Sequence, residues 1–556
     1  MREIGKPPDA CTHARTHTRL PRGVRARCAN CASYITSQTE QGTQARDIRG
    51  KVKKDAPALL VFARTERNND GLARVVLESF SVGAPRPSTD TPMRKLAQAS
   101  ALGSMLVVGG ILAGCSDSGQ PNTPPPSAES TNTIPIALVV SLTGPTQAIG
   151  DEAKRGAEVA VAQLNALGGI LNKRIDLVIE NDNGDPKVTR QKLTELAARG
   201  ITLGIGPSTS TTALEVKDLI ANDQVVYISP SATSRLLDKL TEEEPALPAP
   251  GEPPANPVFF RTAATDVFLS AALTQYASTG EGASRRCPSI VLVQQNDAYG
   301  IPIGEAVESY YQRFSLRVNR KLELDPNVDN TQKLNDAAAA AGRTLDAQCQ
   351  IVVAQPEVAG AYMRSFKEFR EANGALRDWS TFLTIGSDGF RQDDFIVAGR
   401  VNPADPTEPT AGEGSIAVAA DTQPQAPEYS AFLNLFRARF PNLEPGRYGS
   451  TAYDATILLA AAIERAQTTT DHKAIRDTLY RISQGRVRVG PNRLSDMMDL
   501  LRRGEDVNYE GASGSLDFTA TGHVRSGFGV WRIENAQFVK VTSFEVSELD
   551  DVSNAL

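Results

Sequence analysis

Histidine and cysteine are scarce in this chain, which has four histidines and six cysteines among its 556 residues. Only two histidines, His472 and His523, follow residue 115. That part of the sequence also lacks a Gly-x-Ser-x-Gly nucleophile motif and any cluster of His or Cys at metal-ligand spacing. Because a hydrolase needs a nucleophile, a base and an oxyanion site together, we expect no enzyme activity, no cofactor and no bound metal.

Long hydrophobic runs are rare as well, and the most apolar one is too short to cross a membrane. It extends over 101–112, after the charged start Met93-Arg94-Lys95 and before Leu112-Ala113-Gly114-Cys115. This order is typical of a secretory signal, here that of a bacterial lipoprotein. We therefore predict a signal peptide over 93–115, a lipid on Cys115, and a location on the periplasmic side of the cell envelope. The alternative is a buried helix whose cysteine falls there by chance.

The segment 1–92 precedes this signal, which could not direct export from an internal position. We therefore expect Met93 to be the true start, and 1–92 to be upstream sequence translated in error or a disordered segment. It holds 16 Lys and Arg against 9 Asp and Glu, with little periodicity. A zinc knuckle is the alternative, but the apolar pattern that flanks real fingers is missing. Its candidate ligands are Cys11, His13, His17, Cys28 and Cys31.

Positive charge is under-represented after the predicted signal. Residues 116–556 hold 41 Lys and Arg against 56 Asp and Glu, a formal charge of −15. This balance argues against binding to nucleic acid or to anionic membranes, so membrane attachment is expected through the lipid anchor only. The stretch 116–133 is rich in Ser, Pro and Thr without an apolar face, as expected of a flexible tether.

From residue 134 onward, apolar strands alternate with amphipathic helices. The first set contains the strand sequences IPIALVVSL, RIDLVIEND, ITLGIG, VVYISP and VFFRTA, with helices expected over 151–167, 187–199 and 211–221. The second contains SIVLVQ, LRVNRKLEL, QIVVAQ and TFLTIGSD, with helices expected over 266–278, 304–314, 331–341 and 358–372. Strands without polar alternation are buried on both faces. The sequence therefore predicts an α/β protein with two Rossmann-like lobes, parallel sheets and a ligand cleft between them.

Two cysteines remain after Cys115. Cys287 precedes the strand SIVLVQ and Cys349 precedes QIVVAQ. If these strands are neighbours the two cysteines lie side by side, and an oxidising compartment would then favour a disulfide. The alternative is that both are small buried hydrophobic residues.

Hydroxyl side chains follow two strands of the first set. GIGPSTSTT, over 204–212, places Ser and Thr where a helix begins, and SPSATS places Ser231 and Thr233 after the next strand. Helix N-terminal amides and hydroxyls bind anions, but the loop lacks the lysine and glycine pattern of a nucleotide site. A carboxylate is the better ligand, and simple helix capping is the alternative. Asp266 is interpreted as a helix N-cap, and Arg261 is ambiguous.

The ordered set GIGPSTSTT, ISPSATS, FFRTAATD, QNDAYG, IGSDGF and AYDA resembles type I periplasmic binding proteins. The closest subgroup is the Leu/Ile/Val-binding family of amino-acid ABC importers, and the resemblance covers about 134–541. It implies three hinge crossings between the lobes. By analogy, lobe 1 comprises 134–262 and 424–522, and lobe 2 comprises 263–423 and 523–546.

The same resemblance implies the ligand contacts. The α-carboxylate would bind the first lobe, and the second lobe would close with Tyr299 and with Asp388 facing the ammonium group. Asp388 is shorter than the family's glutamate, and Gln355 replaces an aromatic residue, which argues against a branched aliphatic ligand. The predicted first-lobe contacts are Ser210, Ser231, Ala232 and Thr233.

These features predict an extracytoplasmic solute-binding lipoprotein of an ABC importer. It would capture an amino acid or a related small molecule by hinge closure and deliver it to an ABC permease. An envelope sensor or regulatory lipoprotein on the same fold is the alternative, and an extracytoplasmic hydrolase is less favoured.

Overall fold

The computed structural model describes 132–241, 252–280, 287–421 and 425–553, together with the backbone of four strands between 35 and 81. The chain forms two compact units, Met1–Pro121 and Asn122–Leu556. The predicted signal peptide, its Cys115, the zinc-knuckle ligands and most of the tether lie outside the described residues. Among the helices that are described, none has the length and apolar character needed to cross a membrane.

The first unit contains one small sheet. Its strands are β1 (Ile35–Thr39), β2 (Gly42–Gln44), β3 (Leu59–Arg67) and β4 (Ala73–Ser81), in the order β2-β1-β3-β4. The strands β3 and β4 pair antiparallel along their full length. We predicted that 1–92 is upstream sequence translated in error or a disordered segment, and the structure has four strands there. The sequences of β3 and β4, LLVFARTER and ARVVLESFS, are rich in residues that favour strands.

The second unit begins with a five-stranded parallel sheet in the order β6-β5-β7-β8-β9. Its central strands are apolar and almost wholly buried, because helices cover both faces. The strands are β5 (Thr133–Val140), β6 (Arg174–Asn181), β7 (Leu203–Ile205), β8 (Val226–Ser229) and β9 (Phe260–Arg261).

Helices from two distant parts of the chain pack on this first sheet. The early ones are α1 (Gln147–Ala166), α2 (Pro186–Ala198), α3 (Ser210–Glu215) and α4 (Lys217–Ala221), and the late ones are α10 (Pro427–Arg439), α11 (Gly446–Ala466), α12 (His472–Ile482) and α13 (Leu494–Arg502). At Gly156 of α1 an added Cβ would lie 2.0 Å from the carbonyl oxygen of Gly449 in α11, so glycine permits this close helix crossing. Met497 and Met498 of α13 are buried in the same core, so this helix packs on its own lobe.

The second sheet has seven strands in the order β11-β10-β12-β13-β14-β18-β19. It is parallel from β11 to β14, and β18 and β19 are antiparallel. Its strands are β10 (Ser289–Gln295), β11 (Arg317–Leu324), β12 (Cys349–Val353), β13 (Leu383–Gly386), β14 (Ile416–Ala420), β18 (Phe528–Glu534) and β19 (Gln537–Phe544). Its helices are α5 (Asp266–Thr279), α6 (Gly300–Arg313), α7 (Thr331–Gly342), α8 (Pro356–Ala372), α9 (Asp393–Ala398) and α14 (Val546–Ser553).

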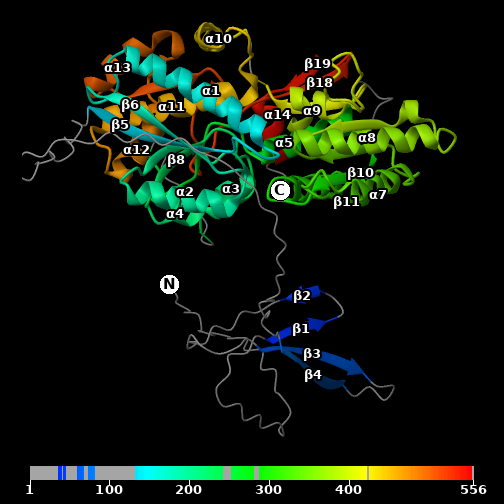
Figure 1. The fold of residues 1–556 in the computed structure, drawn as a ribbon. Coiled ribbons are helices and arrows are strands. Elements are labelled where there is room, and N and C mark those ends of the chain that lie inside the picture. Colours follow the sequence, from blue (N-terminus) through cyan, green and yellow to red (C-terminus); the bar gives the residue numbers. More distant parts are fainter. Residues whose placement is uncertain are drawn as a thin grey trace, which may run out of the picture. The chain divides into compact units, whose positions relative to one another are not determined.

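The two sheets with their helices lie side by side as two lobes (Figure 1). The chain passes between the sheets three times, after β9, after β14 and before β18. The crossings contact one another: the Asp421 N–H donates to the Gly527 carbonyl at 2.9 Å, and Ala264 forms a bridge with Val524. The predicted α/β fold with two lobes and largely parallel sheets is confirmed. A further small sheet consists of β15 (Val487–Val489), β16 (Val507–Gly511) and β17 (Gly514–Ser515).

Cys287 and Cys349 form a disulfide in the second lobe, with their Cα atoms 5.7 Å apart. Cys349 starts β12, which pairs with β10, and Cys287 lies two residues before β10. The neighbouring parallel strands thus bring together two cysteines separated by 62 residues.

Replacing both cysteines by alanine is expected to lower the free energy of unfolding by about 2–4 kcal/mol, because the cross-link restricts the unfolded chain. Urea unfolding of the oxidised protein and the double variant measures this difference. Reduced wild-type protein should unfold at the same urea concentration as the variant. Equal midpoints for the oxidised protein and the variant would contradict the prediction.

Candidate functional site

The two hydroxyl-rich loops of the first lobe lie against each other. Ser210, at the start of α3, accepts hydrogen bonds through Oγ from the backbone N–H groups of Thr233 at 3.3 Å and Ser234 at 3.1 Å. The Ser231 hydroxyl donates to the Ser208 carbonyl at 2.7 Å. Sequence reasoning placed these loops together, and the structure brings the two loops that carry the predicted carboxylate contacts into hydrogen-bond contact at the carboxyl edge of the first sheet.

Arg261 holds the second of these loops in place through hydrogen bonds. It is 1% exposed, donates through Nη1 to the Ser234 carbonyl at 2.8 Å, and pairs through Nη2 with Asp238. Because its guanidinium is engaged by the loop and by Asp238, Arg261 positions the loop and does not face the cleft between the lobes as a free cation.

Tyr299 and Asp388 meet on the second lobe. Asp388 follows the carboxyl end of β13, and Tyr299 is the N-cap of α6. The tyrosine hydroxyl donates to Ser387 Oγ at 2.9 Å and to the carboxylate of Asp388. The resemblance assigned both residues to the second lobe, and the structure brings them into direct contact.

Arg447 is a site residue that sequence reasoning missed. It is the second residue of α11 in the first lobe, and its Nη1 lies 2.5 Å from Asp388 Oδ2 of the second lobe. Its side chain is 12% exposed and that of Asp388 is 3% exposed. Burial opposes the charge on Arg447, but Tyr448 and Asp388 outweigh it and keep the pKa of the guanidinium raised. The only sequence signal was a cation shortly before the AYDA motif.

Asp266 differs from its interpretation as a helix N-cap. The N-cap of α5 is Thr265, and Asp266 is the first helical residue, with its N–H donating to the Thr233 carbonyl at 2.9 Å. Asp266 is only 2% exposed, and neither oxygen of its carboxylate has a hydrogen-bond partner among the described residues. Burial and then the charge of Asp388 raise the pKa of Asp266 well above its usual range. The Thr233 side chain and the charges of Arg261 and Arg447 lower it by less.

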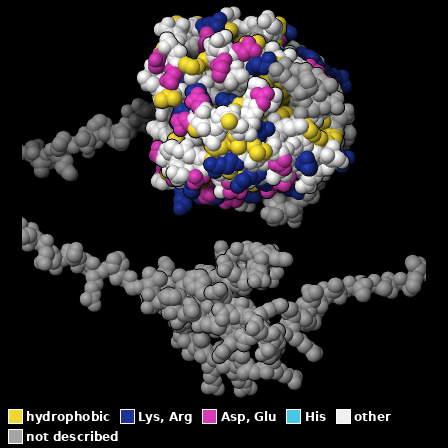
Figure 2. Space-filling model, turned by 90° about the vertical axis from the view of Figure 1, so that its right-hand side faces the viewer, with side chains coloured by type: hydrophobic (Ala, Val, Ile, Leu, Met, Phe, Trp, Pro, Cys, Tyr) yellow, Lys and Arg dark blue, Asp and Glu magenta, His cyan; other side chains and the backbone are white. Residues whose placement is uncertain are grey.

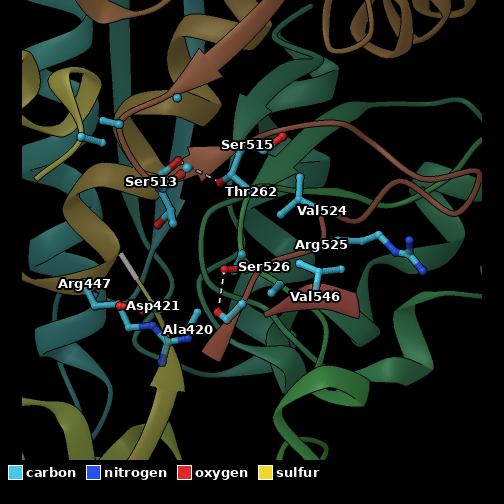
Figure 3. A pocket seen from close by; sticks show the side chains of 18 of the residues that line it. Thr262, Ala420, Asp421, Arg447, Ser513, Ser515, Val524, Arg525, Ser526 and Val546 are labelled. Carbon is cyan, nitrogen blue, oxygen red and sulfur yellow. Dashed lines mark hydrogen bonds between the residues drawn. The ribbon is translucent and has the colours of Figure 1, made fainter. Parts of the chain in front are cut away.

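A hinge cavity of about 340 Å³ lies beside this cluster, lined by the three crossings, the β16–β17 turn, Arg447 and Tyr448. Figure 3 shows Arg447 at one side of it, with Val524 and Val546 opposite and Arg525 pointing away. Two of its hydroxyls are already engaged: Thr262 donates to the Thr451 carbonyl at 2.8 Å, and Ser526 to that of Gly527 at 3.0 Å. The predicted ligand contacts do not line this cavity, so we assign it to the hinge.

A smaller cavity of about 200 Å³ touches Arg447 as well, between α1, α9 and the start of α11. Glu152 lines it and accepts a hydrogen bond from the Tyr448 N–H at 2.9 Å. Burial raises the pKa of Glu152 to about 7. Arg447 therefore borders both cavities.

His472, His523 and the acidic turn after β6 have structural partners. The His472 ring lies 2.8 Å from Thr202 Oγ1 and 2.7 Å from the Asp223 carbonyl, and His523 lies 2.9 Å from Thr521 Oγ1. Asp185 caps α2 by accepting from the Lys187 N–H at 2.8 Å. Within the described ranges, no group of three or more His, Cys, Asp or Glu residues could hold a metal ion.

Comparison with known proteins assigns most of the second unit to one family. Residues 133–526 match the model of a family described as periplasmic binding protein. The Leu/Ile/Val-binding protein BraC3 of Rhizobium johnstonii is 26% identical over 353 residues, which cover 62% of this chain and 83% of that protein. A Leu/Ile/Val-binding protein homologue of Brucella melitensis is 23% identical over 352 residues, with the same coverage of 62% and 83%.

Solved structures share the fold. The isoleucine complex of LivJ from Streptococcus pneumoniae superposes with a TM-score of 0.55 at 20% identity, covering 74% of this chain and 99% of that one. The leucine-binding protein LivK of Thermotoga maritima gives a TM-score of 0.57 at 15% identity, with coverage of 74% and 99%.

Proposed function

The chain belongs to the periplasmic binding protein family, and from that premise we propose that it captures a free amino acid, or a similar small zwitterion, for an ABC importer. Binding between the two lobes would shift an open–closed equilibrium, and the closed form would be presented to an ABC permease. The observation that carries this proposal is the buried carboxylate of Asp266, which has no hydrogen-bond partner among the described residues.

The charges around Asp266 favour a cationic group in the ligand. Asp266 and Asp388 are two buried carboxylates, and Arg447 forms an ion pair with Asp388. A buried carboxylate without donors is costly, whereas an ammonium group would supply up to three N–H donors and one positive charge. An α-ammonium group between Asp266, Asp388 and Tyr299 would therefore complete both the hydrogen bonding and the charge balance.

The loops of the first lobe suit the other end of a zwitterion. Ser210, Ser231, Ala232 and Thr233 are buried where the two hydroxyl-rich loops meet. Ser210 Oγ accepts from two N–H groups of the second loop, so its own O–H group can donate to a carboxylate. Neutral donors of this kind bind a carboxylate without a buried cation. Gln355, at the start of α8, offers an amide where the resembled family has an aromatic side chain, which favours a polar ligand.

We also propose that the protein is a lipoprotein. The motif before Cys115 supports a lipid anchor there, followed by the tether at 116–133, which would hold the two lobes on the periplasmic side of the envelope. The lobe boundaries at 262/263, 423/424 and 522/523 are supported by their position in the three crossings between the sheets.

Asp266→Asn is the variant that tests the proposed function. Free amino acids are screened by thermal shift, and one that stabilises the wild-type protein saturably is expected to lose that effect in the variant. At 100 times its dissociation constant such a ligand stabilises by about 2.7 kcal/mol. Without ligand, the variant should be as stable as the wild type or more so, because the native carboxylate has no partner to lose.

Asp329→Asn, which changes an exposed carboxylate away from the cleft, is the matched control and should keep the full ligand response. The proposal is rejected if no zwitterion shifts the wild-type protein, or if Asp266→Asn responds as strongly as the control.

A further inference from the structure

A third cavity, here called the outer cavity, lies at the edge of the second sheet opposite the ligand cleft. Its volume is about 730 Å³, and Cys349, Leu383 and Ser415 line it at the amino ends of β12, β13 and β14. Tyr299 and Asp388 follow the carboxyl ends of strands in the same sheet. The outer cavity is therefore separated from the proposed amino-acid site by the length of the strands.

Three arginines from different elements line the outer cavity: Arg370 of α8, Arg377 of the following loop, and Arg532 of β18. Arg377 donates to the carbonyl of Ala347 at 2.7 Å and to that of Thr344 at 3.5 Å. Nε of Arg370 is buried and has no hydrogen-bond partner in the described part of the chain. Arg532 Nη1 is 3.8 Å from Glu534 Oε1, and Arg532 has a further partner in the structure, so Arg370 and Arg377 carry the argument that follows.

The carboxylate that lines the outer cavity is used elsewhere. Glu413 accepts hydrogen bonds from the N–H groups of Asn535 and Ala536 at 2.5 and 3.3 Å. Burial lowers the pKa of Arg370, with Glu371 opposing it, and burial lowers that of Arg377 too. Both guanidinium groups are partly desolvated cations. The partners shown for Arg377 are two carbonyls and the Phe382 ring, and for Arg370 the Phe366 ring and the nearby charge of Glu371.

Aromatic rings hold one wall of the outer cavity in place. Arg377 lies 4.2 Å over the Phe382 ring, and Arg370 lies 5.5 Å over that of Phe366. Trp379 meets Phe366 and Phe382 edge to face, at 5.9 and 6.0 Å between centroids, and donates through Nε1 to the Asn373 carbonyl. The cations therefore extend from a packed wall and need little ordering to bind an anion.

We propose that the outer cavity binds a phosphate group, as free phosphate or as a phosphomonoester or phospholipid headgroup. A phosphate offers several anionic oxygens to planar guanidinium donors, whereas a single carboxylate would leave part of this positive charge unpaired. The volume exceeds that of inorganic phosphate, which leaves room for an organic part beside Trp379. Figure 2 faces the side on which α7 and α8 lie, where Lys and Arg side chains occur among apolar and acidic ones.

Titration of the full chain with inorganic phosphate, against chloride at equal ionic strength, tests the proposal. Saturable binding by calorimetry is expected, and Arg370→Gln should weaken it about tenfold or more, since one charge-assisted contact is lost. Arg370 is chosen because its Nε has no hydrogen-bond partner to lose. Arg313→Gln, at the exposed end of α6, is the matched control and should bind phosphate as the wild type does.

The source of the phosphate is distinguished with vesicles. A lipid headgroup is indicated if the protein co-sediments with phosphatidylglycerol vesicles but not with phosphatidylcholine vesicles. Added phosphate and the variant Arg370→Gln should then both reduce the co-sedimentation. Binding of phosphate without vesicle binding would indicate a free ligand. The proposal is overturned if neither binds saturably, or if Arg370→Gln and Arg313→Gln behave alike. Failure here leaves the amino-acid response of the cleft unchanged, so the two proposals are tested separately.

Discussion

Asp388→Ala is expected to lower the free energy of unfolding of the ligand-free protein by about 3–5 kcal/mol. The reason is that the guanidinium of Arg447 would remain buried between the lobes without its carboxylate. Arg447→Met should also be strongly destabilising, because it leaves the buried carboxylate of Asp388 without the guanidinium that pairs with it and with the charge of Asp266 nearby. The double variant should lose much less than the sum of the two single losses, since both charges are then removed together.

Urea unfolding of the four proteins measures the coupling, and about 2 kcal/mol or more of non-additivity is expected. Glu305→Gln provides the control, because Glu305 pairs with Arg235 between the lobes at 3.1 Å with side chains 51% and 37% exposed. The loss of unfolding free energy in Glu305→Gln should stay below about 1 kcal/mol, as for other exposed ion pairs. Simple addition of the Asp388 and Arg447 losses would show that the buried pair contributes no coupling.

Asp454→Ala is expected to cost about 4 kcal/mol, because this buried residue of α11 holds the β16–β17 turn with four hydrogen bonds. Its carboxylate accepts from the Tyr509 hydroxyl at 2.8 Å and from the Ala512 N–H at 2.9 Å. It also accepts from the N–H and hydroxyl of Ser513 at 2.7 and 2.6 Å. Ser513→Ala, which removes one donor, should cost only about 1 kcal/mol.

The pH dependence of Asp454 has a definite sign. Burial raises its pKa from the ordinary 3.8 of an aspartate to about 6, so the folded state binds the proton more tightly than the unfolded chain. Relative to Asp454→Asn, the stability of the wild type should therefore be highest below about pH 4 and fall as the pH rises to about 6. Urea unfolding of both proteins at pH 4.5 and 7.5 measures this, and an opposite trend would contradict the raised pKa.

Several features of the fold were predicted from local patterns because they depend on neighbouring residues. Apolar runs without polar alternation identified the buried strands, and glycine and proline turns marked where helices begin. The nearness of Ser210 and Thr233 followed from a general rule, since the ends of adjacent parallel strands meet at one edge of a sheet. The strands of 35–81 were missed because charge and composition outweighed two short β-rich segments.

The sequence by itself determined the family, the α/β architecture and the position of the hydroxyl loops, because each depends on short-range patterns repeated in a fixed order. Only the tertiary structure decided the state of the site. Arg447 reaches Asp388 from the opposite lobe, and Asp266 is left without a hydrogen-bond partner among the described residues. Pairing and desolvation depend on what packs around a side chain, and residues distant in the sequence provide that packing.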